Sequence, residues 1–316
     1  MPGSEQRYQA FGLSWHSPQL PLPELPAGGK GPRVELTTGD PQHWPPLPAG
    51  RHDTPFVQMA PCELQLTVEG IGRFRVHGGE RIEWWREHDG VSDQDIRTFL
   101  LGSAVGALLI QRGLLVLHGN GLEKHGEAIV CLGHSGAGKS TLAYALLQQG
   151  WRLLADDLVA ISPDGLVLPG IPRIKLWHDA ARAFGLDPEQ LPQMRQGMHK
   201  YLLMGEGLQR ASEPIPLRAL YLLHQRRHAD SEAEERRITR ISSQKAAALR
   251  LRNQAFRPRF VRGLGQEGAN FMALAQLQRR VPLATLPVPA GIEAMQRWLL
   301  EQDLLQACRP ADLVAT

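Results

Sequence analysis

The segment CLGHSGAGKSTLAYALLQQG, Cys131–Gly150, decides the fold of this chain. Its first half has the spacing G-x-x-x-x-G-K-S, which begins at Gly133 and ends at Ser140. In this motif the backbone N–H groups surround phosphate oxygens, the lysine reaches the β- and γ-phosphates, and the serine hydroxyl binds Mg²⁺. The motif predicts a nucleotide site with Ser140 as a metal ligand. The residues that we expect to contact the nucleotide are Gly133, His134, Ser135, Gly136, Ala137, Gly138, Lys139, Ser140 and Thr141.

The sequence on either side fits this interpretation. Glu127–Leu132 is a short apolar run that predicts a strand, and leucines recur at helical spacing between Lys139 and Gly150, a C-capping residue. A strand, a glycine-rich loop and a helix in this order direct the helix N-terminus, with its free N–H groups and positive dipole, at a phosphate. This context disfavours the alternative, a glycine-rich turn without a ligand.

The composition is that of a globular protein of one large or two ordinary domains. The chain has 316 residues, 42% hydrophobic and 21% charged, and a formal net charge of +3. This charge is too small to indicate a nucleic-acid partner. The three cysteines, Cys62, Cys131 and Cys308, are far apart and odd in number, so they suggest neither a disulfide framework nor a zinc cluster.

The chain shows no sign of a membrane or secretory role. Its first residues lack the basic and then apolar pattern of a signal peptide, and the longest apolar run, Phe99–Ile110, is too short to span a bilayer. We therefore expect a cytoplasmic protein that binds neither nucleic acid nor a membrane. Whether it forms a homo-oligomer is left open.

The sequence divides into two regions. Residues 1–95 form a Pro/Gly-rich and β-rich N-terminal region, in which Cys62–Trp85 alternates apolar and polar residues and predicts an antiparallel hairpin or meander. Residues 96–316 are the expected catalytic domain. It begins with a buried helix, predicted from about Asp95 to Gln111.

The strands around the glycine-rich loop are close together in sequence. Residues 114–118, 127–132, 151–154 and 158–161 read as strands that leave room for only one helix. A doubly wound sheet would alternate strand and helix regularly. We therefore predict an α/β fold of α+β character, with a mixed sheet that places the loop among antiparallel pairs. Further on we expect strands at 217–224 and 236–241, a polar interval at 228–235, and helices at 242–251, 268–279 and 292–302.

Two acidic residues and one histidine are candidates for the chemistry. Phosphoryl transfer to an alcohol needs charge neutralisation, alignment and a base near the attacking oxygen. Asp156 and Asp157 follow the helix after the loop, and neighbours on an extended segment point to opposite faces, so one carboxylate can address a metal. His118, in LVLHGNG, is a weaker candidate, because a single histidine is more often structural. The alternative for the acidic pair is a solvated turn.

These residues carry a family resemblance. His118-Gly119, the loop Gly133–Ser140 and the segment Ala155–Val159 resemble, in order and spacing, the catalytic domain of HPr kinase/phosphorylase. The resemblance implies a P-loop kinase domain similar to phosphoenolpyruvate carboxykinase, with ATP and Mg²⁺ as cofactors. It also implies that Asp156 is the base toward a serine hydroxyl, that Asp157 belongs to the metal or catalytic network, and that His118 lies near the transferred phosphoryl group. Lys139 would neutralise the charge of the transferred phosphoryl group.

The chain departs from that family at two places. Thr141 stands where the family has a Glu, and Ile171–Trp177 stands where it has an Arg-Gly-Leu-Gly signature. The whole layout is more similar to HPr-kinase-like proteins of peptide-modification clusters, including kinases that act on a serine of lasso peptides. That likeness implies that Arg173, Lys175 and Lys200 contact phosphate; each could instead be a solvated cation.

The leading hypothesis is an ATP- and Mg²⁺-dependent kinase for a serine or similar hydroxyl of a peptide or small protein, such as a ribosomal peptide precursor. A second hypothesis is a kinase for a small metabolite. A third is a nucleotide-sensing module without an acceptor, in which Asp156 only holds magnesium.

Overall fold

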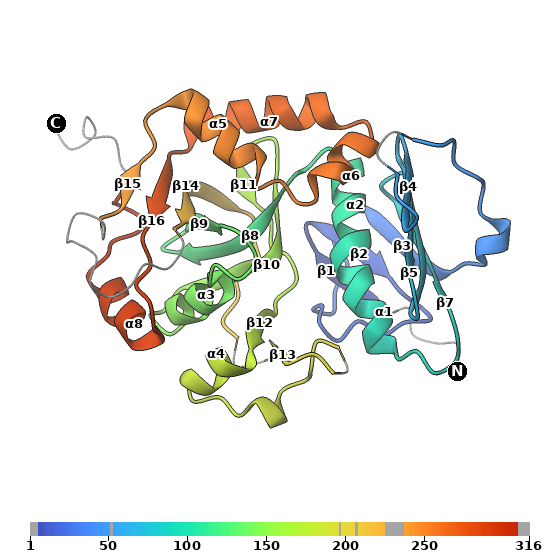
Figure 1. Ribbon diagram of the computed structural model, residues 1–316, viewed down its shortest axis with the longest axis horizontal. Coiled ribbons are helices and arrows are strands. Elements are labelled where there is room, and N and C mark those ends of the chain that lie inside the picture. Colours follow the sequence, from blue (N-terminus) through green and yellow to red (C-terminus); the bar gives the residue numbers. More distant parts are fainter. Residues whose placement is uncertain (1–5, 51–52, 196, 206–207, 225–236, 309–316) are drawn as a thin grey trace.

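Alternating apolar residues build the first of two large sheets from the N-terminal region. The computed structural model describes residues 6–50, 53–195, 197–205, 208–224 and 237–308 (Figure 1). The first sheet has seven strands in the order β1-β2-β3-β7-β6-β5-β4. The strands are β1 (Arg7–Ala10), β2 (Leu13–His16), β3 (Arg33–Thr38), β4 (Val57–Ala60), β5 (Glu63–Val68), β6 (Gly72–His77) and β7 (Arg81–Arg86). Strands β4 to β7 form an antiparallel meander, which confirms the predicted one at Cys62–Trp85.

A helical segment covers one face of this sheet. It consists of α1 (Asp93–Phe99), one π-helical turn, η2 (Leu100–Ala104), and α2 (Val105–Gln111). The predicted buried helix is thus confirmed, although the π turn interrupts it. Figure 1 shows this segment between the two large sheets, and its apolar side chains share one core with residues of both. The predicted division of the chain at residue 95 stays a prediction.

The second sheet also has seven strands, in the order β11-β10-β8-β9-β14-β16-β15. They are β8 (Leu115–Lys124), β9 (Glu127–Leu132), β10 (Arg152–Ile161), β11 (Leu166–Val167), β14 (Ile215–Leu223), β15 (Thr239–Arg240) and β16 (Leu283–Leu286). Strand β14 is parallel to β9 and β16, and the other neighbours are antiparallel. The predicted mixed sheet is confirmed.

One sequence-based detail is wrong. The two predicted strands, 151–154 and 158–161, are replaced by a single strand, β10, which begins at Arg152, so Asp156 and Asp157 lie in its middle. Aspartate is rare in strands, which made a break between two strands plausible. The long partner strand β8 keeps both residues in the ladder, since Asp156 pairs with Asn120 and Asp157 with Gly119, even though the backbone of Asp157 is left-handed.

Helices cover both faces of the second sheet. On one face lie α3 (Lys139–Leu147), α4 (His178–Ala183) and α8 (Ile292–Leu300), and on the other α5 (Gln244–Arg252) and α7 (Glu267–Arg280) (Figure 1). Helix α6 (Pro258–Gly263) packs against α2 and β4. The remaining elements are the two-stranded sheet of β12 (Ile174–Trp177) and β13 (Lys200–Leu203), and the 3₁₀ turns η1 (Pro41–His43) and η3 (Pro188–Gln190).

Most of the later predictions are confirmed within one to three residues, namely the strand near 217–224 and the three C-terminal helices. The predicted strand at 236–241 is reduced to Thr239–Arg240 among the described residues, and the polar interval 228–235 lies outside them. In the described part of the chain, no helix combines the length and apolar character that crossing a bilayer requires.

The residue after His118 has to be a glycine, because two strands approach each other closely there. A Cβ atom placed at Gly119 would lie 2.5 Å from the carbonyl oxygen of Cys131 in β9. Neither atom can move without breaking the pairing of β8 and β9, since Gly119 pairs with Leu132 and Asn120 with Cys131. The His-Gly sequence therefore has a packing reason that is independent of any ligand.

Gly119→Ala should lower the free energy of unfolding by about 1–3 kcal/mol, the usual cost of overpacking a tight core. Urea denaturation monitored by tryptophan fluorescence measures this difference. The matched control is Gly268→Ala in α7, where an added Cβ would meet no atom within 4 Å. Because alanine is a better helix former, the control should keep or slightly raise stability. Equal stability of the two variants would contradict the packing argument.

Candidate functional site

The glycine-rich loop Gly133–Ser140 joins β9 to α3 and has the backbone of an anion-binding loop. Gly136 and Gly138 have φ of 81° and 88°, values that side chains disfavour, and Gly138 is the N-cap of α3. The loop and the first turn of α3 therefore present free N–H groups on one side. Together with the helix dipole they can hold a phosphate group.

Lys139 lies across this loop. Its Nζ donates to the carbonyl oxygens of Gly133, at 2.8 Å, and His134, at 3.0 Å. Burial lowers the pKa of Lys139, whereas the negative charges of Asp157 and Asp156 act in the opposite direction. A buried ammonium whose hydrogen bonds go to neutral carbonyls retains its charge for an incoming anion.

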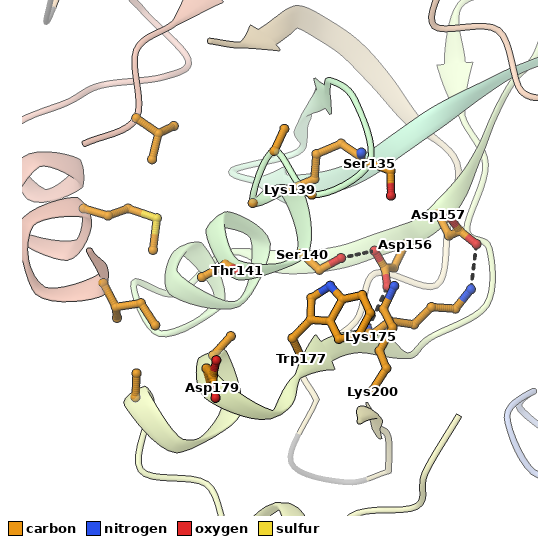
Figure 2. A pocket seen from close by; sticks show the side chains of 18 of the residues that line it. Ser135, Lys139, Ser140, Thr141, Asp156, Asp157, Lys175, Trp177, Asp179 and Lys200 are labelled. Atoms are coloured by element: carbon orange, nitrogen blue, oxygen red, sulfur yellow. Dashed lines mark hydrogen bonds and ion pairs between the residues drawn. The ribbon is translucent and has the colours of Figure 1, made fainter. Parts of the chain in front are cut away.

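Asp156 points toward the start of α3. Its buried carboxylate accepts hydrogen bonds from the Ser140 hydroxyl at 3.1 Å and from the Lys175 backbone N–H at 2.9 Å (Figure 2). It also accepts a hydrogen bond from the Asn120 amide. Burial and the neighbouring charge of Asp157 raise the pKa of Asp156. This carboxylate is thus held beside the serine that the motif assigns to a metal.

Asp157 points the other way. Its carboxylate forms an ion pair with Lys175 Nζ at 2.6 Å, and His118 Nδ1 lies 3.1 Å from Asp157 Oδ1, a contact that becomes an ion pair when the imidazole is protonated. Its φ of 76° is left-handed, which is uncommon for a residue other than glycine and typical of functional positions. Burial alone would raise the pKa of Asp157, but Lys175 and His118 outweigh it and hold that pKa well below its usual value. Asp157 is therefore ionised at neutral pH.

Two cavities meet at this cluster. The first, of about 540 Å³, lies between the glycine-rich loop, α4 and the residues that begin α8. The second, of about 430 Å³, lies between the loop, the π turn η2 and residues 253–257. Four residues line both cavities, namely His118, Ser135, Asp157 and Lys175. The ionised carboxylate of Asp157 therefore stands at the junction of two spaces.

Most of the predicted site residues come together here. The first cavity is lined by Ser135, Gly136, Ala137, Gly138, Lys139, Ser140, Thr141, Asp156, Asp157, His118, Lys175 and Lys200. Gly133 and His134 line the second cavity instead. Lys200 Nζ also lies 5.3 Å from the ring centre of Trp177, a residue of the same cavity (Figure 2).

Arg173 is placed differently from the prediction. It lines neither cavity, and its buried guanidinium faces Glu24 of the N-terminal region, with Nη1 3.9 Å from Glu24 Oε1. Arg97 Nε donates to the same carboxylate at 2.9 Å. Because a buried carboxylate requires cations around it, Arg173 is drawn toward Glu24 and away from the site of Lys175.

Several residues of the site were not found from the sequence. Asn120 carries a signal in retrospect, because a fully buried amide in an apolar strand requires polar partners. The cavities are also lined by residues from segments without a motif, namely Trp177, residues 288–295 and Arg257. Only the tertiary fold brings them to the loop.

The residues around Ser140 fit Mg²⁺. They offer oxygen atoms from a hydroxyl and a carboxylate, the donors that this ion prefers. In addition, Asn120 Oδ1 is buried without a hydrogen-bond partner. The described residues contain no group of three or more His, Cys, Asp and Glu side chains suited to a metal. Mg²⁺ bound together with phosphates needs only one or two protein ligands. The neighbour of Ser140 is Asp156, whereas the predicted metal ligand, Asp157, faces Lys175 and His118.

Comparisons with known proteins support an HPr-kinase-like family, as the sequence motifs predicted. The chain is 50% identical over 75 residues to the HPr kinase/phosphorylase of Treponema pallidum, a match that covers 23% of this chain and 24% of that protein. It is 43% identical over 51 residues to that of Caldanaerobacter subterraneus, covering 16% and 17% of the two chains. The chain thus matches only about a quarter, or less, of the length of these curated relatives. No family model matches the chain.

A solved structure, that of the Hpr(Ser) kinase/phosphatase from Coxiella burnetii, aligns with 59% of this chain and 88% of its own length. The sequence identity is 13% and the TM-score 0.26, a value too low to establish a common fold.

The ion pairs of Asp157 predict a pH-dependent stability. An aspartate whose folded pKa is below its unfolded value, about 3.9, stabilises the fold above that pH, and the stabilisation is lost as the pH falls through the folded pKa. Asp157→Asn should therefore lower the free energy of unfolding by about 1–3 kcal/mol at pH 7, since it leaves the Lys175 ammonium without its carboxylate. Urea titrations should show this difference narrowing as the pH falls below about 3.9.

Asp179→Asn is the control, because Asp179 lines the first cavity but its side chain is fully exposed. It should unfold like the parent protein at every pH. A difference between Asp157→Asn and the parent that stays constant from pH 7 to pH 3 would refute the assigned ion pairs.

Proposed function

We propose that the protein is a kinase that transfers the γ-phosphoryl group of ATP to a serine hydroxyl of a peptide or protein. The observation that carries this proposal is the pair of cavities that meet at Asp157. A nucleotide in one cavity and a hydroxyl in the other would face each other across an ionised carboxylate, the arrangement that direct phosphoryl transfer requires. The similarity to HPr kinase/phosphorylases supports the same reaction class. We also propose the phosphoenolpyruvate-carboxykinase-like fold that the resemblance implies.

The first cavity suits ATP. The loop N–H groups and the cations of Lys139, Lys175 and Lys200 would neutralise the triphosphate. The opposite end of the cavity is lined by apolar side chains, including Val288, Ile292 and Met295, which suit the flat faces of a purine base. Ser140 and Asp156 would hold Mg²⁺, which when bound neutralises charge on the β- and γ-phosphates.

The proposed step is a direct displacement. The serine Oγ attacks the γ-phosphorus, a new P–O bond forms, and the bond from that phosphorus to the β–γ bridging oxygen breaks, so that ADP leaves with the electron pair. The hydroxyl proton passes to the Asp157 carboxylate. Lys175 and His118 hold this carboxylate in place and ionised. Its low pKa suffices, because little proton transfer is needed early in a loose transition state.

This assignment exchanges the roles that the resemblance implied for the two aspartates. Asp156 lines only the first cavity, where Ser140, Asn120 and the Lys175 backbone donate to its carboxylate, so a hydroxyl in the second cavity would not meet it. Asp157 lines both cavities. We therefore propose Asp157 as the base and Asp156 as the residue that binds the metal with Ser140.

Asp157→Asn should lower kcat by about 10²–10⁴, because the amide cannot accept the proton, while ATP affinity should change little. Asp156→Asn should instead raise the Mg²⁺ concentration needed for half-maximal activity. Steady-state kinetics with varied Mg²⁺, and calorimetric titration with an ATP analogue, separate the two effects. If Asp157→Asn altered only the Mg²⁺ requirement and Asp156→Asn only kcat, the roles would be those that the resemblance implied.

Lys139→Ala should abolish transfer and weaken ATP binding, because it removes the ammonium at the β- and γ-phosphates. Lys245→Ala, an exposed lysine of α5, is the control and should behave like the parent protein. The measurement is incorporation of labelled phosphate from ATP into serine-containing peptides, analysed by mass spectrometry. Transfer only to free metabolites would contradict the peptide acceptor. ATP hydrolysis that no acceptor stimulates would contradict the kinase itself.

A further inference from the structure

The second cavity has its own chemical character. We name it the acceptor pocket and define it by its lining outside the glycine-rich loop and the Asp157 cluster, which consists of Thr98, Phe99, Gly102, Ser103, Met194, Asn253, Gln254, Ala255, Phe256 and Arg257. One wall is apolar and aromatic. Small polar side chains and a single guanidinium, that of Arg257, occupy the rest.

Arg257 is held in an unusual conformation. Its φ of 42° and ψ of 75° are left-handed, a region that is costly for a long side chain and that persists where the surroundings enforce it. The guanidinium carbon lies 5.6 Å from the ring centre of Phe256 and 5.4 Å from that of Phe260. Two cation–π contacts therefore fix the direction of this side chain.

The aromatic support of Arg257 is itself rigid. The Phe256 backbone N–H donates to the carbonyl oxygen of Val116 in β8 at 2.8 Å. Its ring packs against Gly106 of α2 so closely that a Cβ atom there would overlap it. The Arg257 guanidinium is therefore positioned relative to β8, the strand that also carries His118.

Arg257 also lacks the ion pairs that occupy its neighbours. Lys175 is paired with Asp157, and Arg173 faces Glu24. Within the described part of the chain, no carboxylate lies within ion-pair distance of the Arg257 guanidinium. The Arg257 side chain is exposed to solvent on one side. The protein atoms packed around it lower its pKa by desolvation, and the negative charge of Asp157 partly compensates. A preorganised cation without a carboxylate partner, facing a pocket, is a binding site for an anion.

We propose that Arg257 selects the acceptor by binding a carboxylate group of the substrate beside the hydroxyl that receives the phosphoryl group. The proposal rests on the function proposed above and adds the substrate class. A carboxylate near Asp157 and the γ-phosphate would be repelled by both, so its binding there requires a cation that neither of them uses. Arg257 meets this condition. The carboxylate can belong to the end of a chain or to an acidic side chain next to the serine.

Three ten-residue peptides of otherwise identical sequence distinguish these sources. One ends in serine with a free carboxylate, one ends in serine amide, and one ends in Ser-Asp amide. The measurements are KM and kcat for each peptide with saturating ATP and Mg²⁺, and peptide affinity by calorimetry in the presence of a non-hydrolysable ATP analogue. The proteins are the parent chain, Arg257→Gln, Arg257→Lys and the control Arg259→Gln. Arg259 is an exposed arginine of α6 that does not line the pocket.

For the carboxylate peptide that the parent prefers, Arg257→Gln should raise KM about 10- to 100-fold, the loss expected for one charged hydrogen-bonded contact. The KM of Arg257→Gln for ATP should equal that of the parent protein. Arg257→Lys should recover part of the loss, because lysine keeps the charge but not the planar fork. Arg259→Gln should match the parent. With the fully amidated serine peptide, the parent and Arg257→Gln should be equally poor. Preference for the free terminus or for Ser-Asp amide identifies the source of the carboxylate.

The inference fails if the parent phosphorylates the amidated serine peptide as efficiently as the two carboxylate peptides, or if Arg257→Gln affects all three equally. The peptide comparison on the parent protein needs no variant, so it remains decisive even if Arg257→Gln does not fold. Failure of the proposed function looks different: ATP binds, but none of the peptides gains phosphate or binds in the calorimeter. That outcome overturns the inference as well.

Discussion

The pairing of β8 with β10 is the constraint on which the rest of the site depends. It aligns Asn120 with Asp156, Gly119 with Asp157 and His118 with Leu158. The left-handed Asp157 then directs its carboxylate away from Asp156. Two adjacent acids thus obtain separate environments, one at the start of α3 and one at the junction of two cavities. A single strand pair therefore separates the two roles that we propose, metal binding by Asp156 and proton transfer by Asp157.

Buried charges connect this strand pair to the N-terminal region. The side chains of Arg173 and Lys175, two residues apart in the sequence, point in different directions. Lys175 pairs with Asp157, and Arg173 faces Glu24. Each of these groups would be costly to bury alone, so each constrains the position of its partner. The position of Lys175 in the site consequently depends on how the segment between β2 and β3, which carries Glu24, packs. The two regions are linked by electrostatics as well as by a shared apolar core.

The parts that could be predicted from the sequence are those whose residues lie close together in the chain. The loop Gly133–Ser140, its flanking strand and helix, and the mixed sheet follow from local patterns that need no distant partner. The continuity of β10 could not be predicted, because the acidic pair contradicts strand propensity and only β8 overrides it. The same holds for Arg173. Its sequence neighbour Lys175 suggested a shared role, but its partner Glu24 comes from the other region.

The acceptor pocket shows how the N-terminal region can influence the site, although none of its own described residues lines the pocket. The nucleotide side is built from the second sheet and its helices, whereas the opposite wall is built from α1, the π turn η2 and the loop at Arg257. A π turn places side chains where a regular helix would not, and such turns are frequent at functional sites. Here it brings Gly102 and Ser103 to the pocket while α1 and α2 stay packed on the first sheet. Changes in that sheet can therefore reshape the acceptor side through α1 and η2, whereas the loop Gly133–Ser140 is carried by the second sheet.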